Sequence, residues 1–166
     1  MPAGATYEPI ATASPSGTSD ITFSSIPSTY TDLRLVCFMQ AVSGTLQPAL
    51  TINGDTGTNY SNTRLVGDGA SATSARQTSQ TEMTLSNSAT ATTVPALFTA
   101  DFFSYAGSTN KTVLGVASAD KNGSGHVERK VFLWRNTAAI TSIKINVYGV
   151  NVASGSTITL YGIKAA

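Results

Sequence analysis

Apolar and polar residues alternate along much of this chain, and this period of two is typical of β-strands that bury one face. The alternation is clearest in the segments Leu33–Met39, Ile143–Val147 and Ile158–Leu160, where every second residue is apolar. Further strands are expected at Tyr7–Ala11, Ile21–Ile26, Ala49–Asn53, Tyr60–Val66, Thr81–Leu85, Val94–Tyr105, Thr112–Ala119 and Val127–Trp134. Because no segment has the repeat of an amphipathic helix, the pattern predicts an all-β protein.

Gly-containing turns separate these segments, as at Asn53–Gly54 and Asn122–Gly125. Parallel strands would need helical crossovers, so the strands are expected to be antiparallel. Many short strands with frequent turns indicate a sandwich, a jelly roll or a barrel. We expect one such domain over residues 20–166, preceded by an N-terminal arm (residues 1–19) that contains a short strand. The polar segment Gly67–Gln80 is expected to be a long loop.

Several predicted strands carry apolar residues on both faces, although a face exposed to water is normally polar. Val94–Tyr105 is the clearest case: its even positions are apolar, and its odd positions end in Phe103 and Tyr105. An arm or loop could cover such residues, or a bulge could switch the faces. Alternatively, they are buried against identical subunits or a larger assembly. The residues expected at such an interface are Tyr7, Ile10, Val36, Phe38, Phe103, Tyr105, Trp134, Tyr161 and Ile163.

The composition argues against several classes of function. Only 11% of the residues are charged, against about 25% in an average domain, and the net charge of +1 gives no basic patch for nucleic acid. Cys37 is the only cysteine, so no internal disulfide can form. The sequence contains no apolar run long enough for a membrane helix, and its first residues do not resemble a secretory signal.

The best catalytic candidates are His126 and Glu128, which share one face of a strand. The spacing H-x-E also occurs in zinc deaminases, but these need two cysteine ligands and Cys37 is alone. We therefore expect a solvated polar stretch here. Asn53–Asn59 is rich in oxygen ligands, but the twelfth position of a calcium loop would be Arg64, so a tight turn is expected. No catalytic residue, cofactor or metal site is predicted.

Five segments together resemble small virion proteins of tailed bacteriophages, especially those of cyanophages and marine phages. The segments are ATYEPIAT with ITFSSIPSTYTDLRLV, LTINGDTGTNYSNTRL, LWRNTAAITSIKI and the terminal LYGIKAA. The resemblance spans most of the chain and is weakest in Gly67–Gln80 and Ser86–Thr93. These segments carry no catalytic residues.

The resemblance implies a jelly-roll-like sandwich, a homotrimer, on the outer capsid surface of a virion assembled in the host cytoplasm. Its expected partners are other copies of itself and the major capsid protein, and its expected role is that of a decoration (cement) protein without enzymatic activity. The alternative is a tail-fibre or receptor-binding domain that recognises a host surface glycan. A carbohydrate-binding module is a further alternative, for which Trp134 and the loop near Tyr60 could supply the aromatic and polar side chains.

Overall fold

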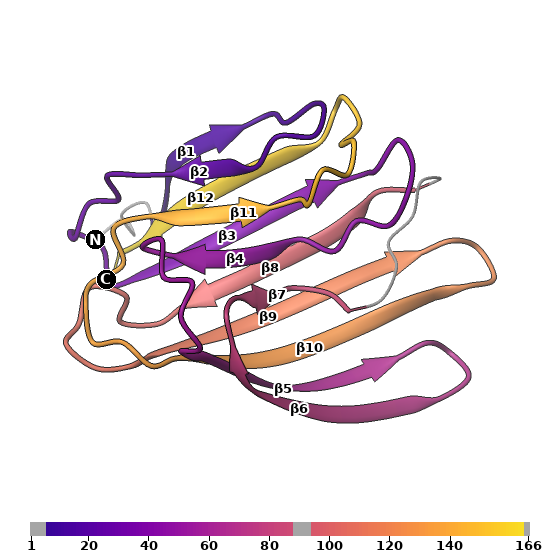
Figure 1. The fold of residues 1–166 in the computed structure, drawn as a ribbon. Coiled ribbons are helices and arrows are strands. Elements are labelled where there is room, and N and C mark those ends of the chain that lie inside the picture. The colour runs from indigo at the N-terminus through magenta and orange to yellow at the C-terminus, as the bar shows by residue number, and fades with distance from the viewer. Residues whose placement is uncertain (1–5, 88–93, 165–166) are drawn as a thin grey trace.

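The computed structural model describes residues 6–87 and 94–164, which form two antiparallel β-sheets that face each other (Figure 1). In spatial order, the eight-stranded sheet consists of β1 (Tyr7–Ala13), β12 (Thr157–Ile163), β3 (Asp32–Met39), β8 (Ala96–Phe102), β9 (Lys111–Asp120), β10 (Gly125–Trp134), β5 (Tyr60–Gly67) and β6 (Ala72–Gln80). The four-stranded sheet has the order β2 (Ile21–Phe23), β11 (Ile143–Asn146), β4 (Ala49–Ile52) and β7 (Met83–Thr84). The predicted antiparallel β-sandwich is therefore confirmed.

The hydrophobic core lies between the two sheets and is built from the alternating positions that the sequence pattern indicates. Leu33, Leu35, Cys37 and Met39 of β3 are fully buried. On the neighbouring β8, the even positions from Ala96 to Phe102 are buried as predicted. The four-stranded sheet and the C-terminal strand contribute buried residues in the same way, namely Ile143, Ile145, Ile158 and Leu160.

One expectation about the secondary structure is wrong. The segment Gly67–Gln80 is not a long loop, because Ala72–Gln80 forms the edge strand β6 and pairs with β5. Its residues are almost all polar and none is buried. A strand at the edge of a sheet is held by backbone hydrogen bonds to one neighbour and can leave both faces in water, so it needs no apolar alternation.

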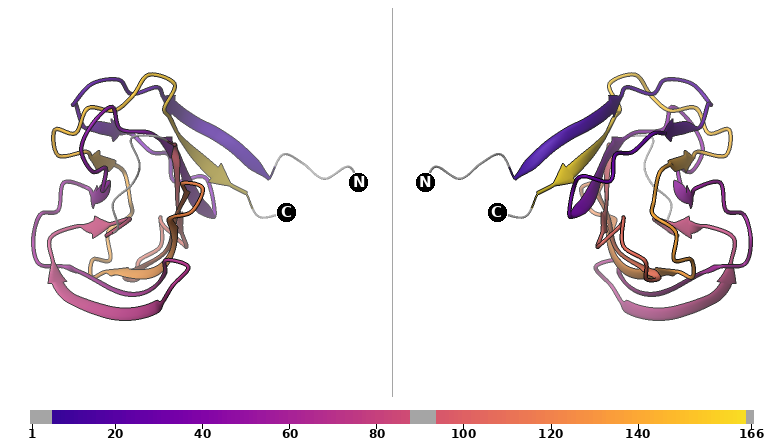
Figure 2. Two further views of the ribbon diagram at one scale, coloured as in Figure 1. Left: turned by 90° about the vertical axis from the view of Figure 1, so that its right-hand side faces the viewer. Right: turned by 90° about the vertical axis from the view of Figure 1, so that its left-hand side faces the viewer.

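The opposite edge of this sheet is formed by the predicted arm, whose strand β1 pairs with β12 of the same chain. A bulge at Ile10 shifts the register, and Ile10 packs against the core. Figure 2 shows β1 and β12 projecting away from the four-stranded sheet. The two ends of the described chain meet there, since Lys164 N donates to Thr6 O at 3.1 Å. Residues 1–5 of the arm lie outside the described residues.

The connection between β4 and β5 crosses from one sheet to the other through the predicted tight turn. Asn53 and Gly54 both have positive φ angles (52° and 69°), and Asp55 N donates to Ile52 O. This turn favours Asn followed by Gly because both central residues are left-handed. The Asp55 carboxylate accepts hydrogen bonds from Trp134 Nε1 (2.7 Å), Gly57 N and Asn59 Nδ2. Asp55 therefore organises the loop through its hydrogen bonds.

Candidate functional site

The outer face of the eight-stranded sheet, which points away from the core, carries many apolar side chains. Five large ones are between 40% and 63% exposed, namely Phe38, Leu65, Leu97, Val127 and Val131. Four neighbouring apolar residues are half-buried, namely Val36, Leu114, Val116 and Leu133. These four and the five exposed residues together are called the outer apolar face. A water-exposed sheet face of this composition is typical of an interaction surface.

The strand register places these side chains side by side across the sheet. Phe38 of β3 is opposite Leu97 of β8, and Leu97 is opposite Ser118 of β9, which in turn is opposite Val127 of β10. The next row of outward residues begins at Val36 and includes Val116. The outer apolar face therefore extends over at least four adjacent strands.

Charges of both signs are interspersed with these apolar side chains. Arg34 and Asp101 occupy opposite positions on β3 and β8, and their side chains lie 3.6 Å apart. Arg129 lies on β10 between the exposed Val127 and Val131. The face thus carries charges of both signs.

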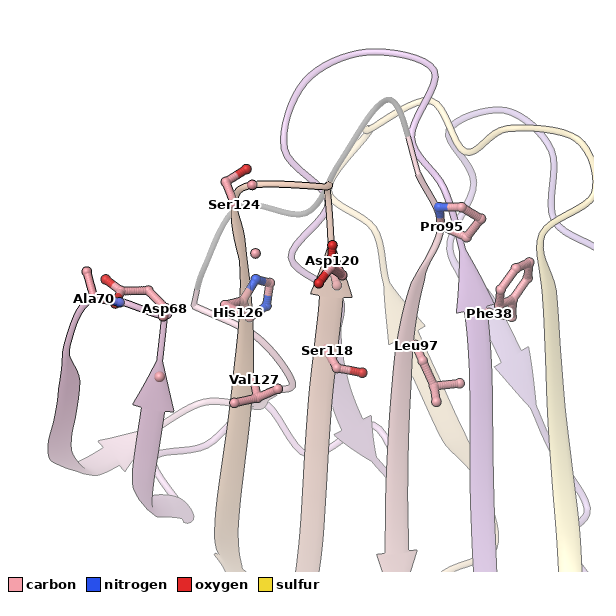
Figure 3. A pocket seen from close by; sticks show the side chains of 15 residues that line it. Phe38, Asp68, Ala70, Pro95, Leu97, Ser118, Asp120, Ser124, His126 and Val127 are labelled. Atoms are coloured by element: carbon pink, nitrogen blue, oxygen red, sulfur yellow. The ribbon is translucent and has the colours of Figure 1, made fainter.

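A hollow of about 840 Å³ lies at one end of the outer apolar face (Figure 3). Leu97, Ser118 and Val127 point into it from three strands, and the loops β5–β6 and β9–β10 form its rim. The Asp68 carboxylate accepts hydrogen bonds from Ala70 N and Ser71 N, and these backbone donors lower its pKa. Asp120 accepts from Asn122 N in the same way. Both carboxylates therefore stabilise their own loops.

The predicted interface residues differ in their exposure to solvent. Tyr7, Phe38 and Phe103 are substantially exposed, and Val36, Tyr161 and Ile163 are half-buried. Tyr7 and Tyr161 contact each other edge to face, with ring centroids 6.3 Å apart. The exposed and half-buried residues remain candidates for an interface.

Trp134 and Tyr105 are corrections, because both are fully buried within the chain. The Trp134 ring stacks on Tyr60 and donates to Asp55. The Tyr105 hydroxyl donates to Pro27 O. Neither ring has surface to offer to a second subunit or to a glycan. Ile10 is corrected in part, since it is partly buried and packs against the core of its own chain.

The expectation of a solvated stretch at His126 and Glu128 is also wrong, since both side chains point into the sandwich and are buried. Glu128 Oε2 accepts hydrogen bonds from Ser86 Oγ (3.1 Å) and Asn87 N (3.1 Å). Ser86 Oγ also lies 3.4 Å from His126 Nε2. Burial lowers the pKa of His126, although the nearby Glu128 opposes this shift.

Lys130 belongs to the same group, and we call the buried Ser86, His126, Glu128 and Lys130, together with the adjoining Asn87, the buried polar cluster. Lys130 Nζ lies 3.0 Å from Glu128 Oε1 and donates to Thr84 O (2.7 Å) and to Asn87 Oδ1. The alternation on β10 indicates that Lys130 is buried, because the apolar Phe132 and Trp134 occupy the same face of the strand. By contrast, Ser86 and Asn87 come from a segment some forty residues earlier, and no sequence pattern indicates that they meet Glu128.

Within residues 6–87 and 94–164, no group of three or more His, Cys, Asp or Glu side chains is arranged to hold a metal ion. The same residues include no helix with the length and apolar character needed to cross a membrane. Comparison with known protein families, curated proteins and solved structures found no match. Function must therefore be inferred from the sequence and the geometry.

Proposed function

We propose that this chain is a structural protein without enzymatic activity, which decorates the outer surface of a tailed-phage capsid as a homo-oligomer and reinforces the shell by binding the major capsid protein. The observation that carries the proposal is the outer apolar face, which a folded single chain leaves in contact with water. The resemblance to tailed-phage virion proteins suggests the kind of particle. Repetition of modest contacts over a capsid lattice can give strong overall binding.

A second copy of the chain is the partner that we propose for the outer apolar face. The face presents both an acidic and a basic side chain, Asp101 and Arg34, close to apolar neighbours. Such a mixed face can complement another copy of itself, whereas a highly charged partner would select one sign of charge. Homo-oligomers that use a shared surface of this kind are common among soluble proteins.

The buried polar cluster supports a non-enzymatic role. A hydrolase with a serine nucleophile would need that hydroxyl to be open to substrate. Ser86, whose Oγ lies 3.4 Å from His126 Nε2, is fully buried. No substrate can reach it without opening of the sandwich.

Counting copies of the protein in purified virions tests the proposal. Hundreds of copies per particle, measured by quantitative mass spectrometry, are expected for a decoration protein. A few to a few dozen copies would instead favour the tail-fibre alternative. Absence from mature particles would contradict both virion assignments.

Comparing particles with and without the protein tests the reinforcing role. Particles that lack it should release their DNA at a lower temperature, because fewer contacts oppose the pressure of the packed genome. Adding back wild-type protein should restore the release temperature, and adding back the outer-face variant Leu97→Asp should not. Equal release temperatures with and without the protein would contradict the reinforcing role.

A further inference from the structure

The buried polar cluster brings a lysine amine, a carboxamide and a carboxylate together between the two sheets. Lys130 Nζ donates a hydrogen bond to Oδ1 of Asn87, so the amine lies next to the carboxamide carbon. Glu128 contacts both partners: Oε1 lies 3.0 Å from Lys130 Nζ, and Oε2 accepts from Asn87 N at 3.1 Å. This arrangement supplies a nucleophile, an acyl group and a proton carrier.

We propose that Lys130 and Asn87 become covalently joined, through an amide bond between Nζ of Lys130 and Cγ of Asn87 that forms with release of ammonia. The bond would link β10 to the segment that follows β7. It is a modification that the chain carries out on itself once, and it does not depend on the proposed virion function.

The surroundings of Lys130 favour the reactive form of its amine. The side chain is 1% exposed. Nζ also lies 5.8 Å from the centre of the Phe132 ring, a cation–π contact that stabilises the ammonium and so opposes the effect of burial. Burial lowers the pKa of Lys130, although the Glu128 carboxylate opposes this shift. A lower pKa increases the fraction of neutral amine, which is the form of lysine that acts as a nucleophile.

Glu128 is placed to move the protons. Its Oε1 lies 3.0 Å from the Lys130 ammonium, with which it forms an ion pair. It can therefore accept a proton from Nζ, which leaves a lone pair for attack on Cγ of Asn87. The Nζ–Cγ bond forms, the Cγ–Nδ2 bond breaks, and Nδ2 leaves with the bonding electron pair. The protons lost from Nζ pass through Glu128 to Nδ2, so one ammonium ion is released and Glu128 returns to the carboxylate.

Asn87 is held in position for this attack from two sides. Its backbone N–H donates to Glu128, and its backbone carbonyl oxygen accepts from Gln47 Nε2 at 3.1 Å. Holding two reacting groups in contact greatly raises their effective concentration. Asn87 is itself exposed, so the released ammonia can reach solvent.

The intact mass of the purified wild-type protein tests the proposal directly. The mass should be lower than the sequence mass by one ammonia. Digestion with trypsin should give one branched peptide that joins the regions of Asn87 and Lys130, with no cleavage after Lys130. A full sequence mass, or a digest in which Lys130 is cleaved normally, would overturn the proposal.

Three variants separate this reaction from cyclisation of an asparagine with its own backbone, which also releases ammonia. Lys130→Arg and Glu128→Gln should both have their full sequence mass, and circular dichroism reports whether they fold. Asn87→Asp should lose one water instead of one ammonia, because its leaving group is a hydroxyl. Persistence of the ammonia loss in Lys130→Arg would assign it to cyclisation and refute the cross-link.

The cross-link should also stabilise the fold, because it connects positions 43 residues apart in the sequence. Asn87→Ala removes the acyl group at an exposed position and should lower the melting temperature by about 10 °C, by analogy with a disulfide that closes a loop of this length. The exposed Asn110 provides a matched control: Asn110→Ala should keep both the mass deficit and the melting temperature of the wild type. Equal melting temperatures for the two variants would contradict a cross-link.

Discussion

Strand β10 presents different chemistry on the two faces of the eight-stranded sheet. The side chains that point into the sandwich include the ionisable His126, Glu128 and Lys130, whereas those that point outward include the exposed Val127 and Val131. In most half-exposed sheets the apolar residues are inside and the polar residues outside. Here the inner charges are satisfied by partners from another segment, and the outer apolar residues have no cover within the described residues. The inner face therefore holds the chain together, and the outer face is available for association.

The largest expected effect comes from removing a charge on the inner face. Lys130→Ala leaves the buried Glu128 without the nitrogen that lies 3.0 Å from its Oε1, removes the hydrogen bond to Thr84 O and prevents the proposed cross-link to Asn87. We expect the free energy of unfolding to fall by about 3–5 kcal/mol, as measured by urea denaturation.

Arg129 is the matched control, since it neighbours Lys130 on the same strand and points outward. Arg129→Ala should change the free energy of unfolding by less than about 0.5 kcal/mol. Similar effects of the two substitutions would show that the inner cluster does not stabilise the fold.

A second inner–outer pair compares apolar residues. Phe132 is buried and covers Gly115, where a Cβ atom would lie 2.8 Å from the Phe132 ring. Phe132→Ala should cost about 3–4 kcal/mol because it leaves a cavity in the core. Val131→Ala, on the outer face of the same strand, should cost well under 1 kcal/mol in a monomer. Thermal unfolding at low protein concentration measures both, and a costly Val131→Ala would indicate that the outer face is covered within the chain.

A substitution on the outer face should weaken association between chains while leaving the stability of each chain nearly unchanged. Leu97→Asp places a carboxylate on the outer apolar face, at a residue that is 40% exposed, so it should dissociate the oligomer and leave the folded chain intact. Thr22→Asp is the matched control, because it introduces the same charge on an exposed position of the four-stranded sheet. Light scattering should show dissociation for the first variant alone. An unchanged mass for Leu97→Asp would exclude this part of the sheet from the interface.

The smallest expected effect concerns pH. Burial lowers the pKa of His126 below its ordinary value of 6.5, so the unfolded chain binds a proton more readily than the folded chain. This contribution to stability is present above about pH 6.5 and is lost as the pH falls toward the folded-state pKa. His126→Gln should flatten the fall in urea midpoint between about pH 7 and about pH 5. An identical pH profile in the variant would contradict this assignment.

The sequence predicted the sheets better than it predicted the cluster. Alternation identified both faces of β3 and the inner face of β8, since burial of apolar residues determines the strand orientation. It did not indicate β6, because a polar edge strand is specified by backbone pairing. On β10 the charges suggested water, but Phe132 and Trp134 on the same face determine the orientation of the strand. The partners Ser86 and Asn87 could not be predicted, because only the packing of β7 against the large sheet brings them to Glu128.

Sedimentation of the wild-type protein over a range of concentrations tests most directly whether another copy covers the outer apolar face. We predict a mass of two or more chains, which decreases only on strong dilution. A mass of one chain at every concentration, up to the millimolar range, would contradict the account.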